Sequence, residues 1–316
     1  MGKLRFLLAL WLGKLSIPAL KITHHNGTDF PGSLAVKVCP DFLKYVGKPP
    51  LMVAVTGTNG KTTVSNMLVD ILEAEGHRVL SNRAGSNITS GVSTAFIRNC
   101  DMLGRVKNCD MAVLEIDERS APKIYPYVRP NYILITNLFR DSIMRNAHPE
   151  YIRDILTKYI PKETKLILNA DDLICCGIAP ENPRVYFGIE KMDTDVTDCV
   201  NLINDLQICP QCHRRLEYEY RRYNHIGRAY CPHCGFKAPA YDYAGCHVDL
   251  DKMRIDVRDA AGIGHYRLLN ESIFNIYNVV SAVAVLREIG YSHAQIEAFF
   301  AKLNIVGSRY DAETIG

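Results

Sequence analysis

Short, almost continuous apolar runs alternate with segments of helical periodicity along the central part of the chain. The apolar runs predict buried strands at residues 51–56, 78–81, 111–116, 132–136 and 165–169. The periodic segments predict helices at residues 62–75, 92–99, 121–127 and 150–159. Strands this apolar leave no polar face for solvent, so both faces of their sheet must be covered. The pattern therefore predicts an α/β fold with a mostly parallel sheet and helices on both faces.

The pattern breaks near residue 200 and then resumes. Residues 209–243 are rich in Cys, Arg, Tyr and His and have almost no aliphatic periodicity. Beyond them, short strands and two helices are expected at 246–250, 254–257, 266–268, 275–288 and 293–303. The simplest interpretation is a small module, residues 205–243, inserted into an α/β domain that spans residues 48–306.

Residues 1–47 are a lead-in to that domain and begin with an apolar run at 6–12. Lys3 and Arg5 precede the run, and Lys14 and Lys21 follow within the same helical pattern. We therefore expect an amphipathic helix with basic residues along one side. It is too short to span a bilayer, and no small-x-small cleavage site follows it. Such a helix either packs on the domain or rests on the inner face of a membrane.

The composition is that of an ordinary globular protein, with 47% hydrophobic and 22% charged residues among 316. The formal net charge of +3 is too small to make nucleic acid or an anionic membrane the default partner. The eleven cysteines are odd in number and are not spaced as a disulfide framework. This usage predicts a reducing compartment, the cytoplasm, where paired cysteines more often hold metal.

A glycine-bearing turn between the first strand and the first helix of the domain predicts ATP binding. The turn and the helix start have the sequence Gly57-Thr58-Asn59-Gly60-Lys61-Thr62-Thr63. This arrangement points backbone N–H groups at phosphate, so all seven residues are candidate ATP contacts. Lys61 would neutralise the β- and γ-phosphates, and the Thr62 hydroxyl would bind Mg²⁺. Val55 stands where the full Walker pattern has glycine, so the loop is a shorter variant.

Glu115 ends the third apolar run and is a candidate catalytic residue and magnesium ligand. An acid at the carboxyl end of a parallel strand lies at the same rim as the phosphate loop. Asp117 could serve in the same way, and Glu118 follows it without an assigned role. The alternative is that these acids only mark a solvated strand end.

The inserted module contains two Cys-x-x-Cys pairs with eighteen residues between them: Cys209, Cys212, Cys231 and Cys234. This spacing predicts a zinc ribbon, in which four thiolates close a tetrahedral structural site. Two matched pairs disfavour a redox dithiol. Basic and aromatic residues nearby leave nucleic-acid binding open, as well as a surface for a partner subunit or for an anionic lipid pyrophosphate. They are Arg214, Arg215, Arg221, Arg222, Arg228, Tyr218, Tyr220, Tyr223 and Tyr230.

Together with the phosphate loop, four further segments resemble the Mur ligases, the ATP-dependent amide-bond-forming enzymes of peptidoglycan synthesis. They are Thr136-Asn137-Leu138-Phe139-Arg140-Asp141, Asn169-Ala170-Asp171-Asp172, Phe274-Asn275-Ile276-Tyr277-Asn278 and Gly307-Ser308-Arg309. The resemblance implies nucleotide contacts for Asn169, Asp172, Asn275, Asn278 and Arg309, with Asn275 and Asn278 near the adenine. It also implies that residues 307–316 begin a C-terminal domain that this chain lacks.

The cysteine module and two further segments resemble one branch of that family, the MurT-type subunits of lipid II isoglutaminyl synthase. The segments are Gly27-Thr28-Asp29-Phe30-Pro31-Gly32 and Ser81-Asn82-Arg83-Ala84-Gly85-Ser86-Asn87. The resemblance implies that ATP activates the α-carboxyl of D-glutamate in the lipid II stem peptide. Ammonia from a partner glutaminase would then give D-isoglutamine. The chain shows no convincing Cys–His glutaminase site, so we expect that partner to be a separate subunit.

The residues are also compatible with two other functions. One is a Mur or folylpolyglutamate-type ligase that adds an amino acid rather than ammonia. The other is a zinc-ribbon ATPase that binds nucleic acid, which the small net charge disfavours. We expect no nucleic-acid partner and place the chain in the cytoplasm or at the inner face of the plasma membrane.

Overall fold

The computed structural model describes residues 2–22, 28–139, 149–198 and 206–302. Its centre is a nine-stranded sheet with the strand order β11-β10-β9-β6-β5-β4-β1-β3-β2. Neighbouring strands from β2 to β9 are parallel, and β10 and β11 join as antiparallel strands. The strands are β1 (Leu51–Thr56), β2 (Val79–Ser81), β3 (Met111–Glu115), β4 (Tyr132–Ile135), β5 (Lys165–Asn169), β6 (Arg184–Ile189), β9 (Tyr243–Asp249), β10 (Arg254–Asp259) and β11 (Gly262–Arg267). The predicted mostly parallel α/β fold is confirmed.

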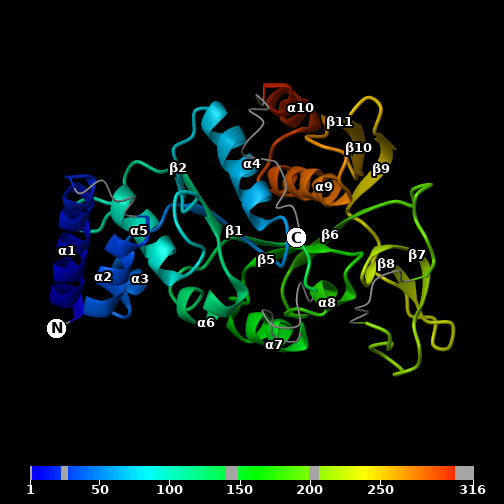
Figure 1. Ribbon diagram of the computed structural model, residues 1–316, viewed down its shortest axis with the longest axis horizontal. Coiled ribbons are helices and arrows are strands. Elements are labelled where there is room, and N and C mark those ends of the chain that lie inside the picture. Colours follow the sequence, from blue (N-terminus) through cyan, green and yellow to red (C-terminus); the bar gives the residue numbers. More distant parts are fainter. Residues whose placement is uncertain (1, 23–27, 140–148, 199–205, 303–316) are drawn as a thin grey trace.

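Helices cover both faces of the sheet (Figure 1). On one face lie α4 (Lys61–Ala74), α9 (Ile273–Glu288) and α10 (His293–Lys302). On the other lie α6 (Ala121–Ile124), α7 (Pro149–Tyr159) and α8 (Leu173–Cys176). Along β1, Val53 and Val55 are buried in the hydrophobic core beneath α4, α9 and α10. Met52 and Ala54 are buried in the core on the opposite face, beneath α6, α7 and α8. Alternate residues of one strand are therefore buried on opposite faces, which explains the unbroken apolar run.

The N-terminal helices form one end of the molecule, next to β2 (Figure 1). They are α1 (Gly2–Ile22), α2 (Phe30–Val38), α3 (Phe42–Tyr45) and, from the central domain, α5 (Thr89–Asn99). Helix α1 packs against α2, α3 and α5 and buries Phe6 and Leu10, so the prediction of a helix packed on the domain is confirmed. The helix differs from the predicted amphipathic one, because the face that is turned away from the domain is also largely apolar. No helix within the described ranges is long and apolar enough to cross a membrane.

Two sequence segments that are far apart meet beside α5. The Asp29 carboxylate accepts hydrogen bonds from the backbone N–H and the hydroxyl of Ser86, at 3.0 and 2.7 Å. Gly32 lies directly on α5, where an added Cβ would come within 1.9 Å of the Ser90 carbonyl oxygen. Residues 28–32 and the segment 81–87 therefore hold the N-terminal helices against the central domain.

The inserted module lies between two neighbouring parallel strands, β6 and β9. It contains the antiparallel pair β7 (Glu217–Tyr223) and β8 (Ile226–Tyr230) at the opposite end of the molecule from α1. The sequence pattern predicted neither this pair nor β6, whose first three residues are only half-buried. The segment 307–316, including Arg309, and the end of the motif at Arg140-Asp141 lie outside the described residues.

Candidate active site

The phosphate loop connects β1 to α4 at the carboxyl edge of the sheet. Gly57 and Gly60 have φ angles of 128° and 85°, values that residues with a side chain rarely adopt. Gly60 is the N-cap of α4 and makes no side-chain capping bond to the first helical turn. No N-cap side chain therefore competes with an anionic ligand for the N-terminus of this 14-residue helix.

The segment after β4 holds this loop in shape. The backbone N–H of Thr58 donates to the Asn137 carbonyl at 2.7 Å, and that of Asn59 donates to Asn137 Oδ1 at 2.9 Å. The Thr136 hydroxyl donates to the Asn59 carbonyl at 2.6 Å. The Thr-Asn pair recognised in the sequence therefore acts as a clamp on the turn between the two glycines.

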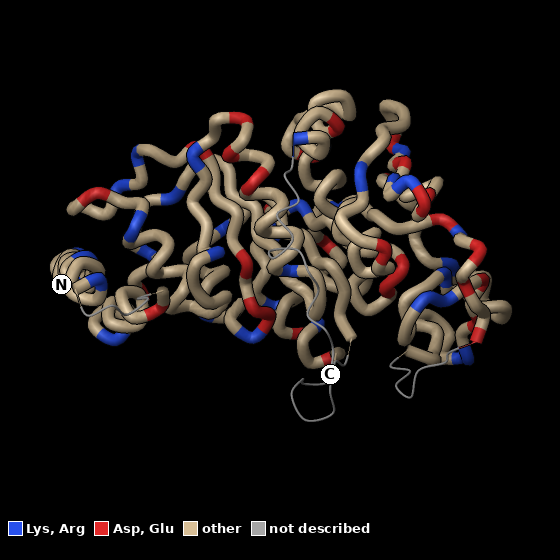
Figure 2. Tube along the Cα trace, turned by 45° about the horizontal axis from the view of Figure 1, so that its top comes forward, with Lys and Arg blue, Asp and Glu red and all other residues tan. Residues whose placement is uncertain are grey.

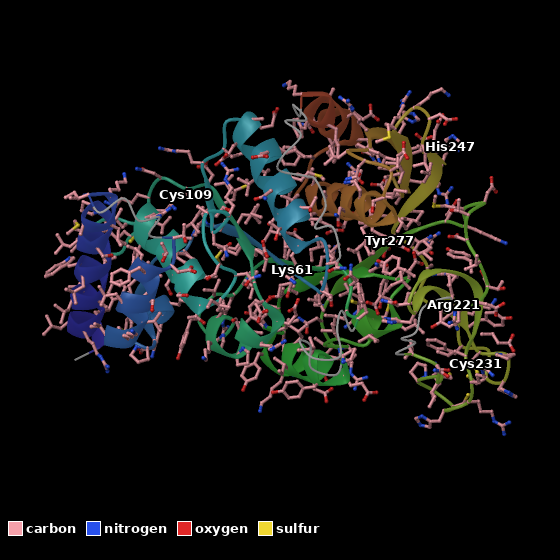
Figure 3. The ribbon with its side chains drawn as sticks, in the orientation of Figure 1. Lys61, Cys109, Arg221, Cys231, His247 and Tyr277 are labelled. Atoms are coloured by element: carbon pink, nitrogen blue, oxygen red, sulfur yellow. The ribbon has the colours of Figure 1, made fainter. Side chains whose placement is uncertain are left out.

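Lys61 lies at the start of α4, near the centre of the molecule (Figure 3). Its side chain folds back onto the loop. Its amino group donates to the carbonyls of Gly57 and Thr58 and to Glu118 Oε1, the last at 3.3 Å. The same Glu118 oxygen accepts the Gly57 N–H at 2.8 Å. Burial raises the pKa of Glu118, with the Lys61 charge opposing the shift. The Glu118 carboxylate thus accepts hydrogen bonds from groups that a phosphate loop uses to bind phosphate.

Sequence reasoning gave no role to Glu118. The signal was available, because Glu118 is the third acid within residues 115–118, at the carboxyl end of β3. It starts the short 3₁₀ helix η1 (Glu118–Ser120), and this turn brings its carboxylate back over the loop.

Glu115, at the end of β3, lies at the same rim as the loop because it pairs with Val55 of β1 in parallel register. Its Oε1 accepts a hydrogen bond from Asn87 Nδ2 at 3.0 Å. The Asn82 side chain accepts a hydrogen bond from the Glu115 backbone N–H at 2.9 Å and donates one to the Glu115 carbonyl at 2.8 Å. Thr62 is exposed in the first turn of α4. The two predicted magnesium ligands therefore lie where β3 ends and where α4 begins, at one rim of the sheet.

Helix α9 brings Asn278 to the phosphate loop, since a Cβ added to Gly60 would lie 2.2 Å from Asn278 Oδ1. One turn earlier, Asn275 Oδ1 accepts the N–H groups of Leu269 and Asn270, at 3.0 and 3.2 Å. Within the described chain, Asn275 Nδ2 is buried without a hydrogen-bond partner. The Phe274 ring lies 4.6 Å from the ring of Tyr223, which comes from the inserted module.

We expect Gly60→Ala to lower the affinity for MgATP at least tenfold and to destabilise the fold by about 2–3 kcal/mol. The reasons are its positive φ and the close approach of Asn278. Calorimetric titration with MgATP and urea unfolding measure the two effects. Gly76→Ala is the matched control, because Gly76 has φ 88° but open space around it. It should cost about 1 kcal/mol and leave the affinity unchanged; equal effects of the two variants on affinity would contradict the assignment.

Asn169 and Asp172, predicted as nucleotide contacts, are fully buried. Asn169 Nδ2 donates to the Thr136 carbonyl at 3.0 Å. Asp172 caps α8, accepts the Leu138 N–H at 2.6 Å and faces His225 Nε2 at 3.0 Å. Burial raises the pKa of Asp172, but the facing His225 and the N–H donors hold that pKa below its usual value. Both residues are therefore buried beneath the segment 136–138, which clamps the loop, and they hold that segment in place by hydrogen bonds.

The neighbouring acid, Asp171, joins the inserted module to the central domain. Arg222 of β7 contacts Asp171 and Asp195, each at 3.0 Å, and the side chains of all three residues are at most 2% exposed. The hydroxyls of Tyr277 and Tyr241 also donate to Asp171. Figure 3 shows Tyr277 of α9 between Lys61 and the module. Since Tyr218 and Tyr220 are buried as well, much of the predicted basic and aromatic surface of the module faces inward.

The four predicted metal ligands form one cluster at the tip of the module, where Figure 3 labels Cys231. Their sulfur atoms all lie within 4.8 Å of one another. The Cys209–Cys234 and Cys212–Cys231 sulfur distances are 3.6 and 3.5 Å, too long for disulfides and near the separation of about 3.8 Å that tetrahedral zinc imposes. His213 and Gly235 hold positive φ just after the second cysteine of each pair, so the two turns match. Four thiols in this arrangement fit a zinc ion.

Residues 55–207 match the Mur ligase middle domain. The chain is 32% identical to the MurT subunit of lipid II isoglutaminyl synthase (glutamine-hydrolyzing) from Staphylococcus aureus, over 92% of this chain and 65% of that protein. It is also 32% identical to the MurT subunit from Streptococcus pneumoniae, over 92% of this chain and 64% of that protein. A solved pseudomurein peptide ligase type C from Methanothermus fervidus has a TM-score of 0.63 at 28% identity, over 84% of this chain and 52% of that one.

Fold, phosphate loop and family match agree on the class: this chain contains a Mur ligase middle domain. Within that class its similarity to the MurT subunits extends far beyond the matched domain and takes in the cysteine module. The chain spans about 65% of the length of these curated relatives.

Proposed function

We propose that this chain is the ATP-using part of a ligase that amidates lipid II with ammonia from glutamine. The observation that carries the proposal is the similarity to MurT subunits over 92% of the chain. The geometry supports it, because a phosphate loop and two candidate magnesium ligands converge at one rim of the sheet.

In this proposal the backbone of residues 57–63 and the Lys61 amino group hold the ATP phosphates. Thr62 and Glu115 would hold Mg²⁺, which neutralises developing charge on the phosphates. Asn275, whose amide nitrogen lacks a partner in the described chain, and Asn278 would contact the adenosine. Arg309, outside the described residues, is proposed as a further nucleotide contact. Asn169 and Asp172 are proposed to act by positioning the loop.

The reaction needs a leaving group on a carboxylate, which is a poor acyl donor. A carboxylate oxygen of the stem-peptide glutamate attacks the γ-phosphorus, and ADP leaves. Ammonia then attacks the carbonyl carbon, and phosphate departs with the former carboxylate oxygen. Phosphate binding also explains the place of Glu118: Lys61 and the Gly57 N–H exchange this carboxylate for the incoming anion.

We further propose that the four cysteines hold one structural zinc ion, with no coordination position left for substrate. Elemental analysis should show about one zinc per chain, and Cys209→Ser with Cys231→Ser should abolish it. Cys100→Ser is the control, because Cys100 lies outside the cluster. Iron, or no metal, in the purified protein would reject the zinc assignment.

The partner in this proposal is a glutaminase subunit, and the place of action is the cytoplasm, at the inner face of the membrane that holds lipid II. The test uses the full-length protein, its glutaminase, lipid II, ATP and glutamine labelled in the side-chain amide nitrogen. We expect one label per stem peptide. Incorporation of a labelled amino acid without the glutaminase would instead support an amino-acid ligase. ATP hydrolysis stimulated by nucleic acid, with no labelled product, would support the ribbon ATPase.

A further inference from the structure

Helix α1 has apolar residues on two opposite faces. Phe6, Ala9, Leu10 and Gly13 are buried against the domain. A second set, which we call the outer stripe, consists of Leu4, Leu8, Trp11, Leu15 and Ile22. These side chains are between 41% and 79% exposed. At about 100° per residue they fall within about 60° of one another, opposite the buried face.

A neighbouring turn extends the outer stripe. The Trp11 indole N–H donates to the Met102 carbonyl at 2.9 Å, which joins the turn to α1. Met102 and Leu103 are 55% and 53% exposed. A Cβ on Gly104 would lie 2.4 Å from the Phe6 ring, so the turn packs directly on the helix. Exposed apolar side chains gathered in one area normally mark a binding surface.

Basic side chains border the outer stripe on both sides. At the helical angle per residue, Lys3 and Lys21 lie about 110° to one side of its centre, and Arg5 lies about 90° to the other. All three are exposed, and α1 contains no acidic residue. Residues 1–50 contain seven basic and two acidic residues, a balance of +5, whereas the rest of the chain sums to −2. In Figure 2, Lys and Arg positions are seen on the helices at the N-terminal end.

The charge pattern selects between two occupants of the outer stripe. Two copies of α1 that packed through it would bring like charges together, because the charges on this helix are all basic. A surface of anionic lipid headgroups supplies the missing negative charge. The boundary between headgroups and acyl chains accepts leucine side chains and favours tryptophan.

We infer that α1 docks this chain on an anionic lipid bilayer, with the outer stripe in the interface and Lys3, Arg5 and Lys21 on the headgroups. The helix lies on the membrane, since no helix in the described part of the chain is able to span it. The inference deepens the proposed function, on which it rests for the choice of membrane, by naming the element that holds the enzyme beside a lipid-linked substrate. Figure 1 shows α1 at one end of the molecule, where it is accessible.

The test is flotation of the protein with vesicles that contain phosphatidylglycerol, compared with vesicles of phosphatidylcholine alone. The wild-type protein should bind the anionic vesicles and release them as salt is raised. Leu8→Glu with Leu15→Glu should lower the affinity at least about tenfold. Ile263→Glu is the matched control, because Ile263 is 51% exposed on β11, and it should bind like the wild type. Lys3→Glu with Lys21→Glu should lower binding to the anionic vesicles specifically.

Three results would overturn the inference: no vesicle binding by the wild type, equal loss in the Ile263→Glu variant, or a dimer that the leucine variant dissolves. The last result would make a second copy the occupant. The MgATP affinity of the variants separates docking from the proposed function, since both helix variants should bind MgATP normally. If the leucine variant fails to fold, the lysine variant decides alone.

Discussion

Replacing Lys61 with alanine should lower the affinity for MgATP about a hundredfold or more and abolish amidation. The substitution removes a cation that lies inside the phosphate loop, where its amino group donates to the Thr58 carbonyl and to Glu118, and that is proposed to hold the ATP phosphates. Because the side chain is only 14% exposed, water compensates little for its loss. Calorimetric titration with MgATP measures the binding, and isoglutamine formation measures the activity.

Two variants make the Lys61 experiment specific. Lys162→Ala removes an 85% exposed lysine paired with an exposed Glu181 and should change neither quantity. Lys61→Ala also leaves Glu118 buried without its cation, so part of its effect falls on stability. Adding Glu118→Gln should restore stability but not affinity. An affinity within threefold of the wild type in the single variant would contradict the role of Lys61.

Replacing Arg222 with alanine should destabilise the protein by about 3–5 kcal/mol, the cost of leaving a buried charge without its partner. Arg222 is 2% exposed and contacts both Asp171 and Asp195. Its guanidinium also donates to the carbonyls of Ile189 and Glu190, so one side chain ties the module to the end of β6. Urea unfolding monitored by circular dichroism measures the loss.

Arg129→Ala is the control for this experiment, because the Arg129–Glu163 pair is 66% and 59% exposed. It should cost less than about 1 kcal/mol. Combining Arg222→Ala with Asp171→Asn should cost less than the two single changes together, since the double variant leaves less uncompensated charge. A loss for Arg222→Ala no larger than that for Arg129→Ala would show that the buried pair does not hold the module in place.

Features that depend on residues close together in the sequence could be predicted from it. The strand–turn–helix pattern around Gly57–Lys61 placed the phosphate loop, and the apolar run before Glu115 placed that carboxylate at the same rim. The spacing of the cysteines likewise anticipated that their four sulfur atoms would meet. Each of these rests on local periodicity or spacing, which a single sequence contains.

Contacts between residues that are far apart in the sequence could not be predicted from it. The contact between Arg222 and Asp171 joins residues 51 positions apart, and nothing in the sequence marks either as a partner of the other. The sequence indicated nucleotide contacts for Asn169 and Asp172, but it did not indicate that both would be fully buried or that His225 of the module would face Asp172. On α1, periodicity identified apolar positions but not which of them would meet the domain, so the outer stripe became visible only in the folded chain.

Oxygen transfer from lipid II to phosphate would show that ATP at this phosphate loop activates a carboxylate. Lipid II carrying heavy oxygen in the α-carboxyl of its glutamate is amidated by the full-length protein with its glutaminase, glutamine and ATP. The released phosphate is then analysed by mass spectrometry. We expect one heavy-oxygen atom in each phosphate, transferred from the carboxylate, and no amidation or labelled phosphate with Lys61→Ala. Amidation accompanied by unlabelled phosphate would show that the carboxylate is not activated by phosphorylation.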